Sequence, residues 1–475
     1  MTGQEPGAVE AVLTAAGLAD DDVRRWIEAS PDILGPVLNE QAARFAAERE
    51  AASRYWALGD DLLHRLPSRP QRSAQEAAAA EVINAAARET RVRFMREWAR
   101  HVYQELTDNF AAFVRVDDLV YKAAEQFPGL VPTRAAVEAE RQHLQRDKDG
   151  AEIDQGLFLS FVLNHPAAGT HLCWAMLRPR PDSLERLEEL RRTGFVDLGA
   201  ASVRRVGRAG HVLMRNTRYL NAEDDATLDG LEMAVDLATL DPEIDVAVLR
   251  GAPVEHPRYK DRHVFSAGIN LTHLYQGQIS YLFYITRDMG LVNKMYRGLT
   301  GPAFLPDEPE TTLEKPWVAA VEAFAIGGGC QILLVMDHVL AEQGSFFNLP
   351  ARKEGIIPGV ANLRLPRFVG DRLARQGILF ERQFAADSPE GRLICDRVVP
   401  VGEMDAAIDE AVALLTGSGV VSAAGNRKAL RVGQEPLDLF RAYMATYARE
   451  QAYCHFSPAL IENLERHWNA RQRKP

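Results

Sequence analysis

Three consecutive glycines, Gly327 to Gly329, mark the point that most limits the fold of this chain. The apolar residues 317–321 before them predict a buried strand, and the residues from Cys330 onward predict a helix. A turn made of glycines lets the backbone approach a ligand closely, because glycine has no Cβ. The helix start that follows carries unpaired N–H groups and a partial positive charge. A strand, a glycine turn and a helix in this order predict a fold built from βα units.

Strand and helix patterns alternate between about residues 196 and 385. Residues 203–214 predict two short strands, residues 225–239 a helix, and residues 245–249 a buried strand. This alternation is typical of an α/β core. The preceding part is rich in Ala, Arg and Glu and nearly lacks β-branched runs, which predicts helices, and the last part is again largely helical. We therefore expect an N-terminal helical domain over residues 1–195, an α/β core over 196–385 and a C-terminal helical oligomerisation region over 386–475.

One N-terminal helix has a clear start signal. Ser73 and Glu76 match a capping box, in which each side chain accepts a hydrogen bond from a free backbone N–H at the helix start. Apolar residues then recur at helical spacing from Ile83 to Leu106, which predicts a long helix with one buried face.

Composition and motifs exclude several classes of protein. The chain of 475 residues has 55 Lys and Arg against 66 Asp and Glu, and this acidic balance argues against nucleic-acid binding. It shows no apolar stretch of the roughly 18 residues that a membrane helix needs, and no signal-peptide pattern at its start. The 4 cysteines form no CxxC pair, the 12 histidines lack metal-ligand spacing, and no phosphate-loop or dinucleotide motif occurs. We expect a cytoplasmic protein that binds no nucleic acid, membrane, metal or cofactor.

A second glycine-containing loop, residues 265–271, precedes the glycine triplet. Two loops whose backbones can approach one ligand, one of them at a helix start, could together stabilise a negative charge developing on an oxygen atom. A glycine triplet alone would indicate only a tight turn. The pair of loops predicts an oxyanion-binding site.

The two loops and their flanking residues resemble the enoyl-CoA hydratase (crotonase) superfamily. The resemblance includes residues 245–251, Lys315-Pro316 and the turn 355–359, with the sequence Gly-Ile-Ile-Pro-Gly. It implies a crotonase-like α/β fold with a ββα spiral core, and an acyl-CoA substrate whose thioester oxygen is held by two backbone amides. By position these are the N–H groups of Ile269 and Gly328. The neighbouring loop residues expected to line the substrate are Ala267, near the adenine, and Gly268, Asn270 and Gly327.

Two positions depart from the hydratase pattern. Hydratases have a glutamate two residues after the glycine triplet and another four residues before the Gly-x-x-Pro-Gly turn, where this chain has Gln331 and Ala351. Glutamine exchanges no proton near neutral pH, and alanine has none to exchange. Activation of water by two carboxylates is therefore not expected.

The helical N-terminal extension, the loop sequence FSAGINL and Gln331 are similar to a cofactor-free branch of the superfamily that oxygenates arylacetyl-CoA thioesters. This resemblance implies O2 as a co-substrate. It implies that Glu223, Arg287 and Gln331 hydrogen-bond the ring hydroxyls, and that Ile356 and Ile357 form an apolar wall beside the reacting carbon. It assigns no general base.

The resemblance also implies partners. The C-terminal helices are expected to form a homotrimer or a dimer of trimers. Five basic residues are candidates for binding the CoA phosphates, namely Arg258, Lys260, Arg262, Arg427 and Lys428. Two alternatives stay open. One is another crotonase-fold acyl-CoA enzyme, such as a thioesterase, isomerase or decarboxylase, and the other is a non-catalytic CoA-binding scaffold.

Overall fold

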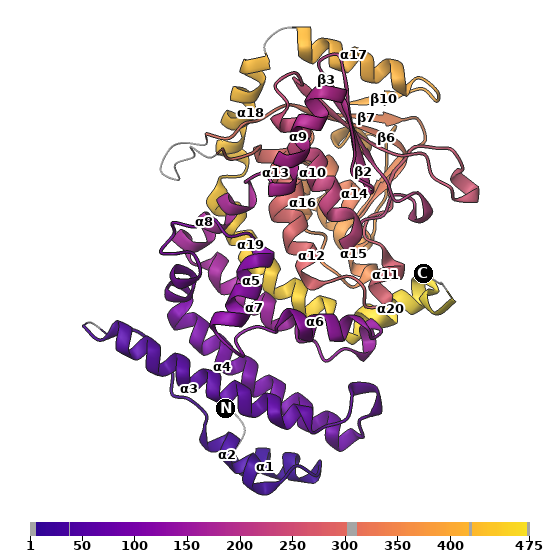
Figure 1. The fold of residues 1–475 in the computed structure, drawn as a ribbon. Coiled ribbons are helices and arrows are strands. Elements are labelled where there is room, and N and C mark those ends of the chain that lie inside the picture. The colour runs from indigo at the N-terminus through magenta and orange to yellow at the C-terminus, as the bar shows by residue number, and fades with distance from the viewer. Residues whose placement is uncertain (1–5, 38, 302–310, 418–419, 473–475) are drawn as a thin grey trace. The chain divides into compact units, whose positions relative to one another are not determined.

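The computed structural model describes residues 6–37, 39–301, 311–417 and 420–472 (Figure 1). The chain divides into two compact units. One consists of Met1–Leu172 and Ala445–Phe456, the other of Cys173–Met444 and Ser457–Pro475. The division falls inside helix α8 (Pro166–Met176) rather than at residue 195. The reason is that α9 (Pro181–Thr193) packs on α10 (Asp225–Leu240), where Asp236 accepts hydrogen bonds from the Arg180 N–H and the Ser183 hydroxyl, both at 2.8 Å.

The first unit is helical, as the sequence predicts. Its longest helix, α4 (Ala74–Leu106), starts with the predicted capping box, in which Glu76 N–H donates to Ser73 Oγ at 3.3 Å and Ser73 N–H donates to Glu76 Oε2 at 2.8 Å. Its predicted apolar face is buried. The other helices of this unit are α1 (Pro6–Ala15), α2 (Asp20–Glu28), α3 (Gln41–His64), α5 (Val116–Gln126), α6 (Arg134–Arg141) and α7 (Ile153–Asn164).

The second unit contains a mixed sheet in the order β1-β2-β3-β4-β6-β7-β10. Strands β1 to β3 pair antiparallel, and the pairs from β3 onward are parallel. The two short strands and the strand after them, predicted from the sequence, are β2, β3 and β4. The bounds are β1 (Phe195–Asp197), β2 (Ala201–Val206), β3 (Ala209–Met214), β4 (Val246–Gly251), β6 (Trp317–Ile326), β7 (His338–Glu342) and β10 (Arg397–Val399).

Strand β6 is longer than predicted and belongs to two sets of strands. Its first half pairs with β4 and β7, and its second half pairs in parallel with β5 (Val264–Ser266) and β8 (Phe346–Asn348). Strand β9 (Phe384–Ala385) pairs antiparallel with β8. Because β5, β6 and β8 are parallel, their carboxyl ends lie at one edge, where ligands of α/β proteins commonly bind.

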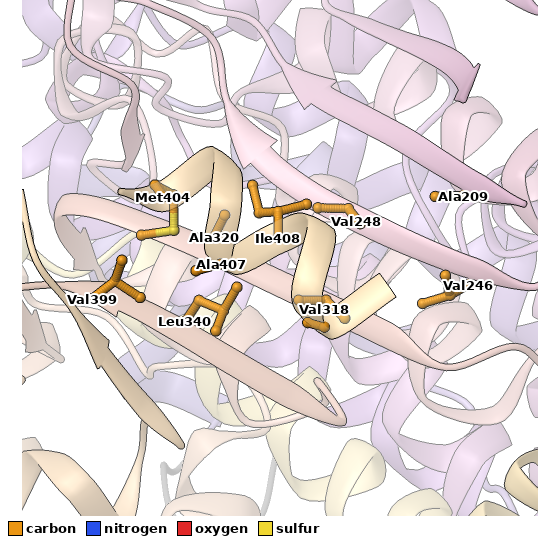
Figure 2. Close-up of a cluster of buried hydrophobic side chains, with 11 residues drawn as sticks. Ala209, Val246, Val248, Val318, Ala320, Leu340, Val399, Met404, Ala407 and Ile408 are labelled. Carbon is orange, nitrogen blue, oxygen red and sulfur yellow. The ribbon is translucent and has the colours of Figure 1, made fainter. Parts of the chain in front are cut away.

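A buried apolar cluster joins α17 (Met404–Gly417) to the main sheet (Figure 2). Met404, Ala407 and Ile408 of α17 lie over side chains of β6, β7 and β10, which are Val318, Ala320, Leu340 and Val399. Buried side chains on the parallel strands explain their nearly continuous apolar sequence. The strand β10 lies in the part of the chain for which the sequence predicts mainly helices.

The remaining helices of the second unit lie between these strands or after them in the chain. They are α11 (Leu271–Tyr275), α12 (Tyr281–Thr286), a π-helical segment (Arg287–Val292), α13 (Asn293–Arg297), α14 (Gly328–Leu333), α15 (Ala351–Glu354), α16 (Ala361–Phe380), α18 (Val420–Gln434) and α20 (Pro458–Trp468). Helix α19 (Leu437–His455) contributes its first residues, up to Met444, to this unit.

Candidate active site

The two glycine-containing loops lie in direct backbone contact. A Cβ added to Gly268 would lie 2.8 Å from the carbonyl oxygen of Ile326 and 3.1 Å from the nitrogen of Gly328. A Cβ added to Gly329 would lie 2.8 Å from the Ser266 Cβ. Such distances leave no room for a side chain, so the close approach of the loops requires glycine.

The amides of Ile269 and Gly328 are both left as donors. The carbonyl of Gly268 accepts from Glu223 N–H at 2.7 Å, and Asn270 N–H donates to the Glu223 carbonyl at 2.8 Å. In this parallel bridge the N–H of Ile269 is directed away from Glu223. Gly328 is the first residue of α14, so its N–H has no acceptor within the helix. Neither amide donates to an acceptor in the part of the chain that the structure describes.

A buried polar cluster lies beside Gly328 and brings together the three residues predicted for the aryl end. Arg287 uses Nε and Nη2 to contact both carboxylate oxygens of Glu223, the Nη2–Oε1 distance being 3.1 Å. Its Nη2 also donates to the Gly328 carbonyl at 2.8 Å. Its Nη1 donates to Gln331 Oε1 at 2.8 Å and to Asp288 Oδ1 at 2.9 Å. These five contacts use all five N–H groups of the guanidinium.

Asp288 is a member of this cluster that the sequence did not indicate. It is 2% exposed, against 5% for Glu223 and 4% for Arg287. Burial raises the pKa of the Asp288 carboxyl, although Arg287 and Arg364 act in the opposite direction. Arg287 and Asp288 open the π-helical segment, a wide turn that is rare in proteins and frequent at functional sites. Helical periodicity gives no signal for such a turn.

The turn that ends at Gly359 borders the same cluster. A Cβ added to Gly359 would lie 2.6 Å from Asp288 Oδ2 and 2.7 Å from Gln331 Oε1, and its φ of +45° also favours glycine. Ile356 and Ile357 lie in this turn and are half-buried. Ala351, which occupies the position of the second hydratase glutamate, is buried. Its carbonyl oxygen accepts a hydrogen bond from Ile356 N–H at 3.0 Å.

Tyr443 of α19 is a further residue that the sequence did not indicate. Its hydroxyl donates to the Gly359 carbonyl and lies 3.0 Å from Asn362 Oδ1. Burial raises the pKa of the Tyr443 phenol well above its ordinary value, and the charge of Asp288 adds to this effect. Since Tyr443 and Gly359 are 84 residues apart, only the folded chain shows their contact.

The other loop residues predicted to line the substrate differ in burial and in their hydrogen-bond partners. Ala267 is half-buried and its N–H donates to the Leu220 carbonyl at 3.1 Å. Gly327 is buried and its N–H donates to the Asn348 carbonyl at 2.8 Å. Asn270 caps α11, where its Oδ1 accepts from His273 N–H at 3.2 Å and its Nδ2 donates to Asp224 at 3.0 Å. The side chain of Asn270 is thus used within the fold.

The five basic candidates for the CoA phosphates divide into two groups. Arg258, Lys260 and Arg262 are exposed on the segment before β5, and Arg262 pairs with Glu342. The prediction is wrong for Arg427, because its guanidinium is buried in contacts with Glu314, Asp337 and the carbonyls of Met295 and Tyr296. Lys428 donates to the Thr312 carbonyl at 2.7 Å.

The described residues contain no group of three or more His, Cys, Asp or Glu side chains that could hold a metal ion. Over the same ranges no single helix is long and apolar enough to cross a membrane, and only the bent pair α17 and α18, taken together, meets the criteria of length and composition.

Comparison with known proteins decides the family. The model of the enoyl-CoA hydratase/isomerase family matches residues 209–431. The chain is 45% identical over 420 residues to a (3,5-dihydroxyphenyl)acetyl-CoA 1,2-dioxygenase of Amycolatopsis orientalis, an alignment that covers 88% of this chain and 93% of the relative. The chain belongs to the enoyl-CoA hydratase/isomerase (crotonase) superfamily. The crotonase fold predicted from the two loops is thereby confirmed.

Crotonase-superfamily relatives of other kinds match a smaller part of the chain. A probable mitochondrial enoyl-CoA hydratase of Dictyostelium discoideum is 24% identical over 211 residues, which are 44% of this chain and 67% of the relative. A solved enoyl-CoA hydratase of Mycobacterium avium subsp. paratuberculosis superposes with a TM-score of 0.47 and 23% identity, covering 56% of this chain and 98% of that one. The alignment with the dioxygenase, at 88% of this chain, therefore also includes most of the helical unit.

Proposed function

We propose that this protein is a cofactor-independent dioxygenase that converts 3,5-dihydroxyphenylacetyl-CoA and O2 into 3,5-dihydroxyphenylglyoxylate and CoA, a step toward dihydroxyphenylglycine for glycopeptide antibiotics. The observation that carries the proposal is the 45% identity to a dioxygenase of that name over 93% of its length. The site supports it, because two amide donors lie beside a polar cluster suited to a hydroxylated ring. The side chains at the two hydratase acid positions, Gln331 and Ala351, support a reaction other than hydration.

The amides of Ile269 and Gly328 would bind the thioester oxygen. The benzylic carbon of an arylacetyl thioester lies between two electron-withdrawing groups, so its C–H bond is unusually acidic. Donors aimed at the oxygen favour the enolate over the neutral thioester, and loss of one such donor typically costs about 2.7–4 kcal/mol. Deprotonation of the substrate is therefore the step that this geometry accelerates, while the base that accepts the proton stays unassigned.

The substrate itself supplies the electrons for the reduction of O2. The aryl-conjugated enolate carbon bonds to O2 and gives a peroxide, whose terminal oxygen attacks the thioester carbonyl. CoA leaves as the thiolate, the O–O bond breaks and the benzylic carbon becomes a ketone. Four electrons leave this carbon and four enter O2, both oxygen atoms stay in the 2-oxo acid, and the two benzylic protons balance the charges of the products. No external reductant is needed.

The rest of the substrate is assigned by position. The ring hydroxyls would bind at the cluster of Glu223, Arg287 and Gln331, which adjoins Gly328 as required for a ring one carbon away from the thioester. Ile356 and Ile357 would form the apolar wall where O2 lodges. The CoA portion would follow Ala267, Gly268, Asn270 and Gly327, with its phosphates near Arg258, Lys260 and Arg262.

Assembly and location are part of the same proposal. Apolar side chains that are exposed on the C-terminal helices support a homotrimer or a dimer of trimers, since they would be covered by a second copy. They include Leu414, Val421 and Val432, at 80%, 88% and 71% exposure. The four cysteines are free thiols, which supports a cytoplasmic location.

The test compares incubation in air with incubation under argon. Purified protein receives 3,5-dihydroxyphenylacetyl-CoA, and O2 uptake, free thiol and 2-oxo acid are measured. We expect equimolar O2 uptake and CoA release in air and neither under argon. Thiol release without O2 uptake would indicate another crotonase-fold enzyme, and tight CoA binding without turnover would indicate a scaffold.

Cofactor independence is tested on the same assay. The protein is dialysed against a chelator, its metal and flavin contents are measured, and its rate is compared with that of untreated protein. We expect an unchanged rate. Activity that disappears and returns only with added iron or copper would contradict this part of the proposal.

A further inference from the structure

The hydrogen bonds of Arg287 limit what this residue can do for a substrate. Each of its five N–H groups already has an acceptor in the protein, on Glu223, Asp288, Gln331 or the Gly328 carbonyl. A ring hydroxyl could bind the guanidinium only by displacing one of these acceptors. Breaking a buried charged hydrogen bond is costly. The guanidinium therefore acts most directly on its protein neighbours.

Gln331 is the neighbour that this arrangement orients. An arginine only donates hydrogen bonds, so the atom of Gln331 that faces Nη1 at 2.8 Å must be its carbonyl oxygen Oε1. The Nε2 amide group then lies on the other side, with two N–H donors that meet no acceptor in the described ranges of the chain. Gln331 is also the partly exposed member of the cluster. Its amide is thus held in the orientation that presents donors to a bound molecule.

Asp288 contributes the second contact to the same Nη1 atom. Glu223 holds the opposite edge of the guanidinium through Nε and Nη2, so Nη1 is left to Asp288 and Gln331. One carboxylate would balance the charge of Arg287, yet the cluster buries two. A second buried carboxylate is costly unless its hydrogen bonds are needed. Because Asp288 accepts a hydrogen bond from Nη1, its carboxylate can prevent the guanidinium plane of Arg287 from rotating.

We propose that Asp288 is a positioning residue, whose carboxylate fixes Arg287 and thereby keeps the Gln331 amide turned with its N–H groups toward the aryl end of the substrate. This inference rests on the proposed function, because it assumes a hydroxylated aryl group beside Gln331. Gly359 supports it from the other side, since Asp288 Oδ2 and Gln331 Oε1 both lie against its Cα, with no space for a side chain. The charged or titratable groups that face Asp288 are Arg287, Glu223, Arg364 and Tyr443.

Two substitutions separate positioning from simple loss of structure. Asp288→Asn keeps an oxygen that can accept from Arg287 Nη1 but has no charge, whereas Asp288→Ala removes the acceptor. The substrates are 3,5-dihydroxyphenylacetyl-CoA and phenylacetyl-CoA, which share the thioester and differ in the ring hydroxyls. We expect Asp288→Ala to lower kcat/KM at least tenfold more for the hydroxylated substrate than for the unsubstituted one. We expect Asp288→Asn to recover most of that selectivity.

Asp236→Asn is the matched control. Asp236 is also a fully buried carboxylate, but it pairs with Lys294 and Ser183 away from the cluster. We expect it to lower thermal stability without changing the ratio of the two kcat/KM values. If Asp288→Ala lowers both substrates equally, as a structural defect does, or if Asp288→Asn loses as much selectivity as Asp288→Ala, the positioning role is overturned.

Anaerobic binding distinguishes failure of this inference from failure of the proposed function. Dissociation constants of the two thioesters are measured under argon by calorimetry for wild type and each variant. A wild type that consumes no O2 would reject the proposed function, while a selective loss of affinity in Asp288→Ala, at least tenfold for the hydroxylated thioester, would still support positioning. Unchanged relative affinities and rates in Asp288→Ala would reject positioning alone.

Discussion

The hydroxyl of Tyr443 donates a hydrogen bond to the carbonyl oxygen of Gly359, so α19 holds the turn that borders the polar cluster. Gly359 in turn faces Asp288 Oδ2 and Gln331 Oε1. A residue outside the two glycine-containing loops thus supports the surroundings of Gln331, and it does so through the backbone of the turn.

Replacement of Tyr443 by Phe should weaken both stability and activity. The Gly359 carbonyl would lose its phenolic donor, and an unmet buried polar group costs about 1–3 kcal/mol. We expect a lower melting temperature and a reduced kcat with 3,5-dihydroxyphenylacetyl-CoA, measured by calorimetry and O2 uptake. Tyr453→Phe is the control, since Tyr453 is 46% exposed, and it should change neither quantity. An unaltered kcat in Tyr443→Phe would show that the turn does not depend on this bond.

Gly359→Ala should impair the site more than its backbone strain explains. The left-handed conformation at φ +45° costs a residue with a Cβ about 1–2 kcal/mol, and here the Cβ would also displace Asp288 and Gln331. Gly402→Ala is the matched control, because Gly402 has φ +84° and no atom within 4 Å of an added Cβ. We expect both variants to lose stability and only Gly359→Ala to lose most of its kcat. Similar kcat values for the two would contradict the packing described for Gly359.

Gln331→Glu should not produce a hydratase. The new carboxylate would face Arg287 Nη1 and pair with it, and Ala351 leaves the second acid position without a proton-transferring group. Water would therefore lack its two carboxylate partners. The measurement is hydration of crotonyl-CoA, followed by the loss of enoyl absorbance. A rate clearly above that of the wild type would show that one carboxylate is sufficient in this site.

Glu223→Ala should reduce selectivity for the hydroxylated ring. Arg287 would keep Asp288 as a counter-charge, so the fold should survive. If Glu223 accepts a ring O–H, the preference of the enzyme for the dihydroxyphenyl over the phenyl substrate should shrink by about 1–3 kcal/mol. The ratio of kcat/KM for the two thioesters measures this change. Equal losses on both substrates would remove Glu223 from the ring pocket.

Glu354 should make stability depend on pH. Burial raises the pKa of its carboxyl to about 7 from the ordinary 4.5, and the neighbouring Glu381 adds to this effect. The folded state therefore binds the proton more tightly than the unfolded state. This contribution is fully present below about pH 4.5 and is lost as the pH rises through about 7. Its full size is about 3 kcal/mol.

Glu354→Gln tests this dependence, because glutamine is neutral at every pH. The free energy of unfolding, measured by urea denaturation between pH 5 and pH 8, should fall less steeply with pH in the variant than in the wild type. Glu381→Gln should reduce the slope only in part. Parallel curves for wild type and Glu354→Gln would mean that this carboxyl does not titrate in that range.

The sequence predicted the parts of the site that depend on short motifs. The two loops follow from residues that are adjacent in the chain, and the resemblance to the superfamily assigned the amides of Ile269 and Gly328 and the missing carboxylate at Gln331. The resemblance added Glu223 and Arg287, and the structure brings both to Gln331. Their roles toward a substrate stay predictions, as do those of Ala267, Gly268, Asn270, Gly327, Ile356 and Ile357.

The residues that the sequence did not indicate either contact partners far away along the chain or lie in irregular backbone. Tyr443 reaches Gly359 across 84 residues, and Asp288 joins the cluster at a π-helical turn that breaks the usual helical spacing. Arg427 resembled a surface charge because the acids that it contacts, the buried Glu314 and the exposed Asp337, lie about 100 residues away along the chain.

Strand β6, which pairs with β4 and β7 in its first half and with β5 and β8 in its second, affects which parts of the site can change in evolution. The pairing of β6 with β5 and β8 determines the positions of the amides of Ile269 and Gly328. Both donors are backbone N–H groups. A point mutation in the gene can exchange any side chain around them, but only a change to proline deletes a peptide N–H. Carboxylates, amides and apolar groups can therefore replace one another at positions such as 331 and 351 while the two backbone donors stay in place. With the enolate bound there as proposed above, new reactions in this fold can arise by altering what happens to the enolate after it has formed.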